Sequence, residues 1–302
     1  MQRSSITNGY HPIIGNGFYY SQSTIQRIAE QLQASAENQV PIMLPEDDVG
    51  SDTRPHSVLN DPTQGFPDAP DAPMEARTLI NVEGNIAAGK NALLELLSQY
   101  KNMEICLEPM ADWRNYHGMD PLRLSYLNPT KYAAAFQHHV FKTQTEIVQK
   151  KWVQPVRLIE RSMESSSNVF LEALFENEFI NRLDYQILKE DYKTGIMANR
   201  HTGTIYLDCD PDTAFQRVQR NRRIEGLSTY TYFQSVNHHY ERYIKHLIDQ
   251  GGQVIIIDTS GDWKELAKIS HVIGTCIEKN DMETLFSYRA QHLQDYFELR
   301  QL

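Results

Sequence analysis

A turn with two glycines and a lysine is the part of this sequence best suited to chemistry. It follows a short apolar, β-branched run at 78–82, and leucines recur at helical spacing after it. In a turn of this kind, backbone N–H groups and the positive end of the next helix bind phosphate, while the lysine contacts the outer phosphates. The alternative is a plain glycine turn with a surface lysine. The candidate phosphate-binding loop comprises Gly84, Asn85, Ile86, Ala87, Ala88, Gly89, Lys90 and Asn91.

Asn91 departs from the usual pattern of such loops. The spacing fits G-x-x-x-x-G-K, but the next residue is normally a serine or threonine whose hydroxyl holds Mg²⁺. An asparagine carbonyl oxygen is also a ligand for a hard cation, so the change would weaken the metal site without removing it. Alternatively, it marks a site that has lost its chemistry.

Glu108 is a candidate general base. With Pro109 it follows the apolar run at 103–107, and a proline cannot continue the hydrogen bonding of a strand. The carboxylate is therefore expected at the rim of a sheet, with Trp113 five residues further on. A carboxylate in that place could accept a hydroxyl proton. The alternative is an acid on a solvated loop.

Glu160 and Arg161 follow directly after a second apolar run, 156–159, and charged groups that emerge from a buried strand need partners. Glu160 could help to hold Mg²⁺, and Arg161 could neutralise a phosphoryl group during transfer. The alternative is a structural ion pair that closes the strand.

Two glutamines, Gln137 and Gln144, lie on or beside the apolar stripe of a helix that we expect to begin at Asn128-Pro129. Each amide offers a donor and an acceptor, so the pair could face a pocket and bind the edge of a planar polar ligand. Alternatively, both point to solvent at the margin of the stripe. The stripe consists of Ala133, Phe136, Val140, Ile147 and Val148.

A second helix, expected to begin at Asp210-Pro211, carries a group of arginines. Arg217 and Arg220 share a face, where like charges repel unless an anion lies between them, and a phosphate would supply that anion. The alternative is a solvated basic face, to which Arg222 also belongs.

Apolar strand candidates alternate with long helical patterns from residue 78 onward. This alternation predicts an α/β fold in which parallel strands are joined by helices, with ligands bound at the carboxyl ends of the strands. The predicted strands span 78–82, 103–107, 156–159, 204–209 and 253–257.

Composition narrows the possible classes of function. The chain has 302 residues and a formal net charge of −10, which argues against binding a nucleic-acid polymer. No apolar run is long enough to span a membrane, and three cysteines without a C-x-x-C motif favour a reducing intracellular compartment. We expect the cytoplasm rather than the mitochondrion, because the first 29 residues contain only two basic residues.

The N-terminal quarter of the chain differs in composition from the rest. Residues 46–75 contain eight acids and five prolines, a composition that cannot bury enough apolar surface to fold. We therefore expect a disordered acidic arm and linker at 1–77, a phosphate-loop domain at 78–281 and a C-terminal helix at 282–302.

In order and spacing, the motifs resemble those of the deoxynucleoside kinase family. The resemblance covers roughly residues 78–270 and implies a P-loop kinase fold with a five-stranded parallel sheet and an arginine-bearing lid. Its motifs are Gly84 to Lys90, Glu108-Pro109-Met110-Ala111-Asp112-Trp113-Arg114-Asn115, Tyr126 with Pro129 and Phe136-Gln137, Glu160-Arg161-Ser162, Tyr206 to Arg222, Glu225, Tyr232, Asp258 and Asp262-Trp263.

The resemblance implies a role for each matching residue. Glu108 is the base for the 5′-hydroxyl, Lys90 and Arg161 bind phosphate, and Glu160 and Asn91 serve the metal. Arg217, Arg220 and Arg222 form the lid over the phosphates, while Asp262 and Trp263 lie near the ATP. The nucleoside pocket consists of Trp113, Tyr126, Phe136, Gln137, Gln144, Ser166, Phe170 and Glu225; within it, Gln137 pairs with the base, Phe170 stacks on it, and Tyr126 and Glu225 hold the sugar 3′-hydroxyl.

The chain departs from the family at Ser165-Ser166-Ser167, where members have Ser, then Ala or Asp, then Arg. Loss of the arginine at Ser167 would weaken the pocket. The small Ser166 resembles the alanine of members that accept thymidine, so the resemblance favours pyrimidine deoxynucleosides.

The reaction implied by the resemblance is transfer of the ATP γ-phosphoryl group to a deoxynucleoside 5′-hydroxyl, with Mg²⁺ as cofactor. Family members are commonly homodimers, which this sequence neither supports nor denies. Two alternatives remain at this point: a catalytically impaired relative that acts as a binding or assembly module, and a nucleoside monophosphate kinase.

Overall fold

The computed structural model describes residues 77–197, 202–221, 224–261 and 263–287. The expected arm at 1–77 lies outside these residues except for Arg77. The part of the expected C-terminal helix beyond residue 287 also lies outside them. Among the described residues, no helix combines the length and the apolar character that crossing a bilayer requires.

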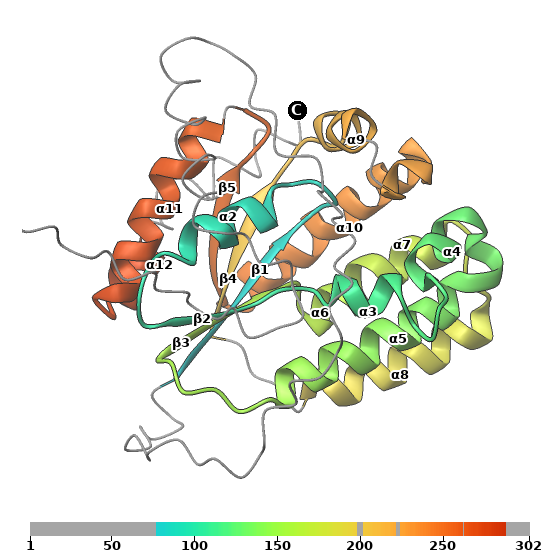
Figure 1. The fold of residues 1–302 in the computed structure, drawn as a ribbon, viewed down its shortest axis with the longest axis horizontal. Coiled ribbons are helices and arrows are strands. Elements are labelled where there is room, and N and C mark those ends of the chain that lie inside the picture. Colours follow the sequence, from blue (N-terminus) through green and yellow to red (C-terminus); the bar gives the residue numbers. More distant parts are fainter. Residues whose placement is uncertain (1–76, 198–201, 222–223, 262, 288–302) are drawn as a thin grey trace, which may run out of the picture.

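A five-stranded parallel sheet forms the centre of the molecule (Figure 1). Its strand order is β2-β3-β1-β4-β5, so the chain places β1 in the middle and builds outward on both sides. The predicted α/β fold and its five strands are confirmed. The strands are β1 (Thr78–Gly84), β2 (Met103–Cys106), β3 (Val156–Glu160), β4 (Gly203–Asp208) and β5 (Gln253–Asp258).

The three central strands are buried nearly throughout, as is usual for a parallel sheet that helices cover on both faces. Successive side chains of β1 alternate between the two faces. Ile80 and Val82 belong to the main hydrophobic core. Leu79 packs with Ile159 and with Ile147 on the opposite face.

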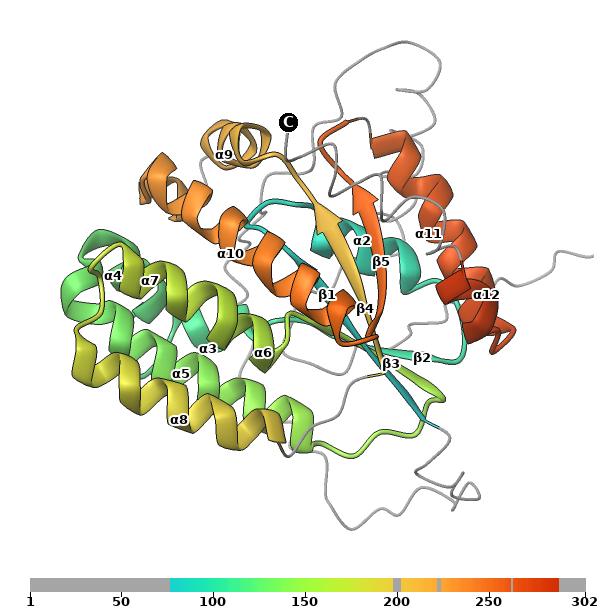
Figure 2. The ribbon, with the colours of Figure 1, turned by 180° about the vertical axis from the view of Figure 1, so that it is seen from behind.

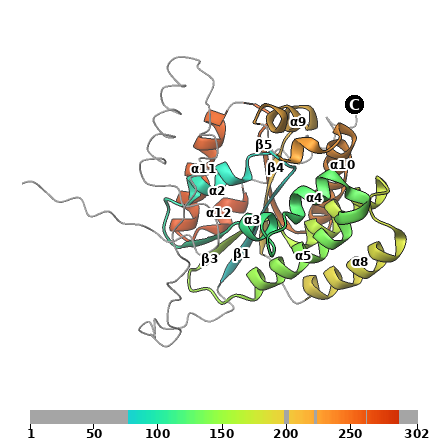
Figure 3. The ribbon, with the colours of Figure 1, turned by 45° about the vertical axis from the view of Figure 1, so that its right-hand side comes forward.

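Helices form a layer on each face of the sheet. Helices α2, α11 and α12 cover one face, and α10 and the end of α5 cover the other (Figures 1 and 2). Beyond the sheet, α4 and α8 pack on α5, and α3 lies next to α4 (Figure 3), while α7 packs against α10. The helices are α2 (Lys90–Leu97), α3 (Met110–Arg114), α4 (Pro121–Leu127), α5 (Pro129–Gln149), α6 (Met163–Ser165), a π-helical segment (Ser166–Leu171), α7 (Glu172–Glu176), α8 (Arg182–Met197), α9 (Pro211–Arg220), a 3₁₀ turn (Ile224–Leu227), α10 (Tyr230–Asp249), α11 (Trp263–Glu278) and α12 (Met282–Ser287).

The two helix starts expected from Asx-Pro pairs are confirmed. Helix α5 begins at Pro129, and α9 begins at Pro211, where Asp210 accepts a hydrogen bond from the backbone of Thr213 at 3.1 Å. Helix α12 packs on the sheet, because a Cβ atom added at Gly203 of β4 would lie 2.2 Å from the Phe286 ring.

Candidate active site

The phosphate loop joins β1 to α2 and depends on its glycines. Gly84 has a φ of 149°, and a Cβ atom there would lie 2.7 Å from the carbonyl oxygen of Leu207. Gly89, which precedes α2, has a φ of 104°, in the left-handed region that favours glycine. Only glycine therefore fits both positions without strain or a clash, and the predicted strand, loop and helix are all present.

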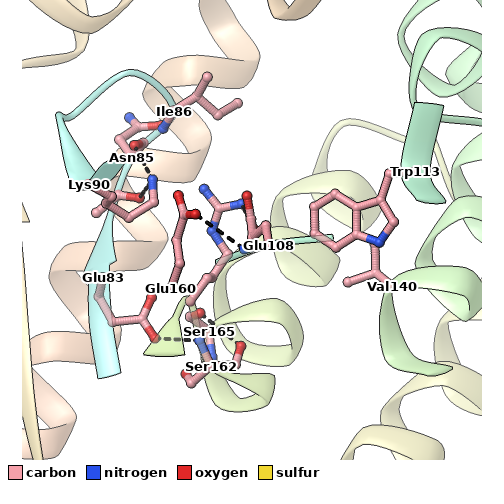
Figure 4. Close-up of polar contacts among 12 residues, drawn as sticks. Glu83, Asn85, Ile86, Lys90, Glu108, Trp113, Val140, Glu160, Ser162 and Ser165 are labelled. Carbon is pink, nitrogen blue, oxygen red and sulfur yellow. Dashed lines mark hydrogen bonds and ion pairs between the residues drawn. The ribbon is translucent and has the colours of Figure 1, made fainter. Parts of the chain in front are cut away.

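Side chains of the loop hold its backbone in place. Asn85 is fully buried, donates to the carbonyl of Phe233 at 3.2 Å, and accepts from the backbone of Ile86 at 2.7 Å. The Lys90 ammonium donates to the carbonyl oxygens of Gly84 and Asn85, both at 3.1 Å (Figure 4). Burial, followed by the nearby Arg161, lowers the pKa of Lys90 to about 8. Lys90 is therefore buried and is not the surface lysine of the plain-turn alternative.

Three charged side chains meet beside this loop because β2, β3 and β1 are neighbours in the sheet. The Arg161 guanidinium donates to the Glu108 carboxylate, and the backbone N–H of Glu108 donates to Glu160 at 3.3 Å (Figure 4). Burial raises the pKa of Glu108 to about 7, although the Arg161 charge opposes this shift. The solvated-loop alternative for Glu108 is wrong, since its side chain is only 10% exposed.

Arg161 has a positive φ of 63°, which is uncommon for a residue with a side chain. Its backbone N–H donates to the carbonyl oxygen of Val82 at 3.0 Å, which fixes the turn after β3 against β1. The guanidinium carbon lies 4.2 Å from the centre of the Phe170 ring. Strained backbone held by its surroundings is common at functional sites, and here it directs the cation toward Glu108.

Aromatic side chains lie near this ion pair (Figure 4). The rings of Trp113 and Phe136 meet edge to face with centres 5.6 Å apart, and the Trp113 indole donates to Thr143 at 3.0 Å. Tyr126 of α4 lies near Glu225 of the 3₁₀ turn, where burial and this acid raise the pKa of Tyr126 well above its usual range. The structure thus brings the two expected sugar-binding residues together.

Both glutamines of α5 are buried, so the alternative in which they point to solvent is wrong. The Gln137 side-chain oxygen accepts a hydrogen bond from the Tyr192 hydroxyl at 3.2 Å. Gln144 lines a cavity with Glu108 and Arg161, and neither amide atom of Gln144 has a partner within the described part of the chain. Both amide atoms of Gln144 are therefore available to a ligand, whereas the side-chain oxygen of Gln137 already accepts a hydrogen bond.

The arginines of α9 are placed differently from one another. Arg217 donates to the carbonyl oxygens of Thr259 at 2.6 Å and Ala87 at 3.4 Å, so it contacts the phosphate loop directly. Arg220 is exposed at the end of the helix. Arg222 and Asp262 lie outside the described residues, and Trp263 begins α11.

Lys189 donates to the position that lacks the arginine of the family. The Lys189 ammonium of α8 donates to the carbonyl oxygen of Ser167 at 3.1 Å and to its hydroxyl at 3.3 Å, and it pairs with Glu172 at 2.6 Å. Ser166, which precedes Ser167 in the sequence, is almost fully buried. A cation from a distant helix thus lies against Ser167.

Sequence reasoning missed two buried groups beside the site. Glu83 of β1 is fully buried and accepts hydrogen bonds from the backbone of Ser162 at 2.9 Å and from the Tyr240 hydroxyl at 3.1 Å. Tyr192 is equally buried. The strict alternation of a buried strand could have placed Glu83 on the face of Leu79, but no sequence signal identifies its partners.

The residues present fit a magnesium ion that is held mainly by its nucleotide. Glu160 offers a buried carboxylate next to the loop, and Asn91 offers an amide oxygen at the start of α2. The described residues contain no group of three or more acidic, histidine or cysteine side chains that could hold a metal ion. Most ligands of such an ion would therefore be phosphate oxygens and water, as Mg²⁺ prefers.

Comparison with known proteins agrees with this geometry. Residues 80–280 match the family model described as deoxynucleoside kinase. The mitochondrial thymidine kinase 2 of Homo sapiens is 29% identical over 201 residues, which are 65% of this chain and 76% of that protein. A probable deoxycytidine kinase of Fowlpox virus is 28% identical over 198 residues, 63% of this chain and 81% of its own.

Human deoxycytidine kinase is 26% identical over 195 residues, which are 55% of this chain and 75% of that protein. The family model matches well over half of the chain, and the matched region contains the phosphate loop, Glu108 and Arg161. The chain belongs to the deoxynucleoside kinase family.

Proposed function

We propose that this chain transfers the γ-phosphoryl group of ATP to the 5′-hydroxyl of a deoxynucleoside, with a preference for pyrimidine bases. The ion pair between Glu108 and Arg161 beside the phosphate loop carries this proposal. It supports the proposal because a carboxylate that could accept a proton lies beside a cation that could bind phosphate. The small, buried Ser166 supports the preference for pyrimidines.

Glu108 would accept the proton of the 5′-hydroxyl. Its burial raises its pKa to about 7, which makes it a better proton acceptor than an ordinary carboxylate. Arg161 and Lys90 would bind the phosphoryl oxygens on which charge is distributed during transfer. Most of the rate enhancement would then come from positioning and from neutralisation of charge.

Binding of the triphosphate would replace contacts that the loop makes internally. The two carbonyl oxygens bonded by Lys90 are weaker partners for an ammonium group than phosphate oxygens. We propose Glu160 and Asn91 as the protein groups that would hold Mg²⁺. The ion would neutralise charge on the β- and γ-phosphates.

A direct assay tests the proposed function. The purified chain is incubated with labelled ATP, Mg²⁺ and each deoxynucleoside or its monophosphate, and the products are separated. We expect monophosphates to form from deoxynucleosides, with thymidine or deoxycytidine as the best acceptor. Labelled diphosphates formed from monophosphates would support the nucleoside monophosphate kinase instead.

No transfer to any acceptor would favour the impaired relative. Two features of the site speak for activity. Glu108, Arg161 and Lys90 are all present and converge beside the loop, and Arg161 is held in a strained conformation that a binding module has no need to keep.

A further inference from the structure

Tyr192 lies against the glutamine that is expected to pair with the nucleobase, and it comes from a different helix. It belongs to α8, is fully buried, and its ring meets Phe141 of α5 edge to face with centres 5.2 Å apart. Its hydroxyl donates to two oxygens of one residue, the side-chain oxygen of Gln137 at 3.2 Å and the backbone oxygen of Gln137 at 3.3 Å.

The single hydroxyl proton of Tyr192 is thus shared by two acceptor oxygens, both of which belong to Gln137. Burial raises the pKa of Tyr192, so the proton stays on the hydroxyl at any physiological pH. If the Gln137 amide were turned over, its NH₂ group would face that proton in place of an oxygen. The hydroxyl would then donate to the backbone oxygen of Gln137 alone and accept from the NH₂ group, and a phenol oxygen is a weaker hydrogen-bond acceptor than an amide oxygen.

Ser166 also contacts the Tyr192 hydroxyl. The two side chains form a hydrogen bond in which either hydroxyl can be the donor. Ser166 is itself 2% exposed. The three side chains form a chain of hydrogen bonds that runs from Ser166 through Tyr192 to the Gln137 oxygen.

The orientation of this amide matters because pyrimidine bases present opposite edges to it. Thymine offers a carbonyl oxygen beside a ring N–H group, whereas cytosine offers an amino group beside a ring nitrogen acceptor. A glutamine satisfies either edge, but it must turn its amide over to change from one to the other.

We propose that Tyr192 is a positioning residue that biases the Gln137 amide toward one orientation and so makes the enzyme discriminate between thymidine and deoxycytidine. This inference rests on the proposed function, in which Gln137 contacts the base. Tyr192 itself touches Gln137 and Ser166, and its effect on the nucleobase passes through the amide.

The test compares Tyr192→Phe with the wild-type chain. The phenylalanine keeps the ring packing on Phe141 and removes only the hydroxyl. We measure kcat and KM for thymidine and for deoxycytidine, together with nucleoside dissociation constants by calorimetry. The ratio of kcat/KM for the preferred nucleoside to kcat/KM for the other should fall about three- to tenfold, which is the effect of one neutral hydrogen bond. The change should appear in KM and in the dissociation constants.

Two further variants make the result specific. Tyr185→Phe is a matched control, since Tyr185 lies on the same helix and donates its hydroxyl to Glu172 at 2.9 Å, away from Gln137. It should leave the ratio unchanged. Ser166→Ala removes the side chain that bonds to Tyr192 and should change the ratio in the same direction as Tyr192→Phe, by a smaller factor. Ser166→Ala added to Tyr192→Phe should then change the ratio no further, which separates an effect through Tyr192 from direct contact between Ser166 and the base.

Three outcomes would overturn the inference while leaving the proposed function intact. They are an active wild-type chain that uses both nucleosides equally well, a Tyr192→Phe variant with an unchanged ratio, and a variant that loses activity equally with both nucleosides. A wild-type chain that phosphorylates neither nucleoside would instead overturn the proposed function itself.

Discussion

The Glu108 carboxylate lies between a cation and a second acid. Arg161 stabilises its charged form, whereas burial and Glu160 favour the neutral form, and the net result is a pKa raised to about 7. A group balanced in this way can both accept a proton and release it at neutral pH. The hydrogen bond from Arg161 holds the carboxylate in place, and the bond from the Glu108 backbone to Glu160 fixes the main chain beside it.

Replacement of this carboxylate tests its role as the base. In Glu108→Gln the shape of the side chain is kept, but the proton acceptor is lost. We expect turnover to fall by about 10²- to 10⁴-fold, the usual contribution of a general base, with ATP affinity changed by less than about twofold. Steady-state kinetics and ATP calorimetry give both numbers. The exposed Glu146→Gln on α5 is the control, and unchanged turnover in Glu108→Gln would remove Glu108 from this role.

Glu83 makes the stability of the fold depend on pH. Burial raises its pKa above the ordinary value of 4.5, so the folded protein binds this proton more tightly than the unfolded chain does. The stability that Glu83 contributes is therefore greatest below about pH 4.5 and is lost as the pH rises through the folded-state pKa.

The Glu83→Gln variant should lose this dependence. It keeps an acceptor for the Ser162 backbone and cannot ionise. Its free energy of unfolding should therefore increase relative to that of the wild type as the pH rises from 4.5. Urea unfolding at a series of pH values measures the difference. Parallel curves for the two proteins would show that burial does not shift the pKa of Glu83.

At the scale of elements, the order of the strands explains why distant segments meet. β3 lies between β1 and β2, so the ends of all three deliver the loop, Arg161 and Glu108 to one place. The sequence predicted these strands well, because runs of apolar, β-branched residues between charged turns have few other uses in an α/β chain. The strand ends differ from the prediction by at most two residues.

The contacts between elements could not be predicted in the same way. Lys189 donates to Ser167 across 22 residues of sequence, and Tyr240 donates to Glu83 across 157. Such pairs depend on how helices pack on the sheet, and periodicity reports only which face of each element is buried. The pattern leaves the burial of both α5 glutamines open for this reason, because they lie on or beside the apolar stripe and the stripe does not show what covers its margin.

The loop between β1 and α2 should not tolerate a side chain at its first glycine. In Gly84→Ala the new Cβ atom meets the Leu207 carbonyl oxygen at 2.7 Å, and the φ of 149° adds backbone strain. The loop must then shift away from β4, and ATP affinity should fall at least about tenfold. Calorimetry with ATP and Mg²⁺ checks this result.

Gly251→Ala is the matched control for that substitution. It adds the same methyl group at a positive φ of 77°, but no atom lies within 4 Å, and Gly251 precedes β5 at the other end of the sheet. ATP affinity should stay at the wild-type value. Equal affinities in Gly84→Ala, Gly251→Ala and the wild type would show that the loop is not the binding site.

At the scale of the whole molecule, the phosphate loop brings together cations from separate parts of the chain, beside the acids of the site. The chain carries a formal charge of −10, yet cations converge on the phosphate loop. Lys90 lies within it, Arg161 follows the neighbouring strand, and Arg217 reaches the Ala87 carbonyl oxygen. This distribution suits a small, highly charged anion held at one point.

Binding of that anion should stabilise the whole fold. A ligand that binds only the folded state at 100 times its dissociation constant raises the free energy of unfolding by about 2.7 kcal/mol. We therefore expect ATP with Mg²⁺ to raise the melting temperature of the intact chain and ATP alone to raise it less. Lys90→Ala should remove most of the shift, whatever its own melting temperature is.

Asn91→Ser restores the usual hydroxyl and should enlarge the part of the shift that depends on Mg²⁺. If ATP and Mg²⁺ leave the melting temperature of the wild-type chain unchanged, the loop after β1 binds no nucleotide. The proposed kinase activity would then have no binding site for its phosphoryl donor.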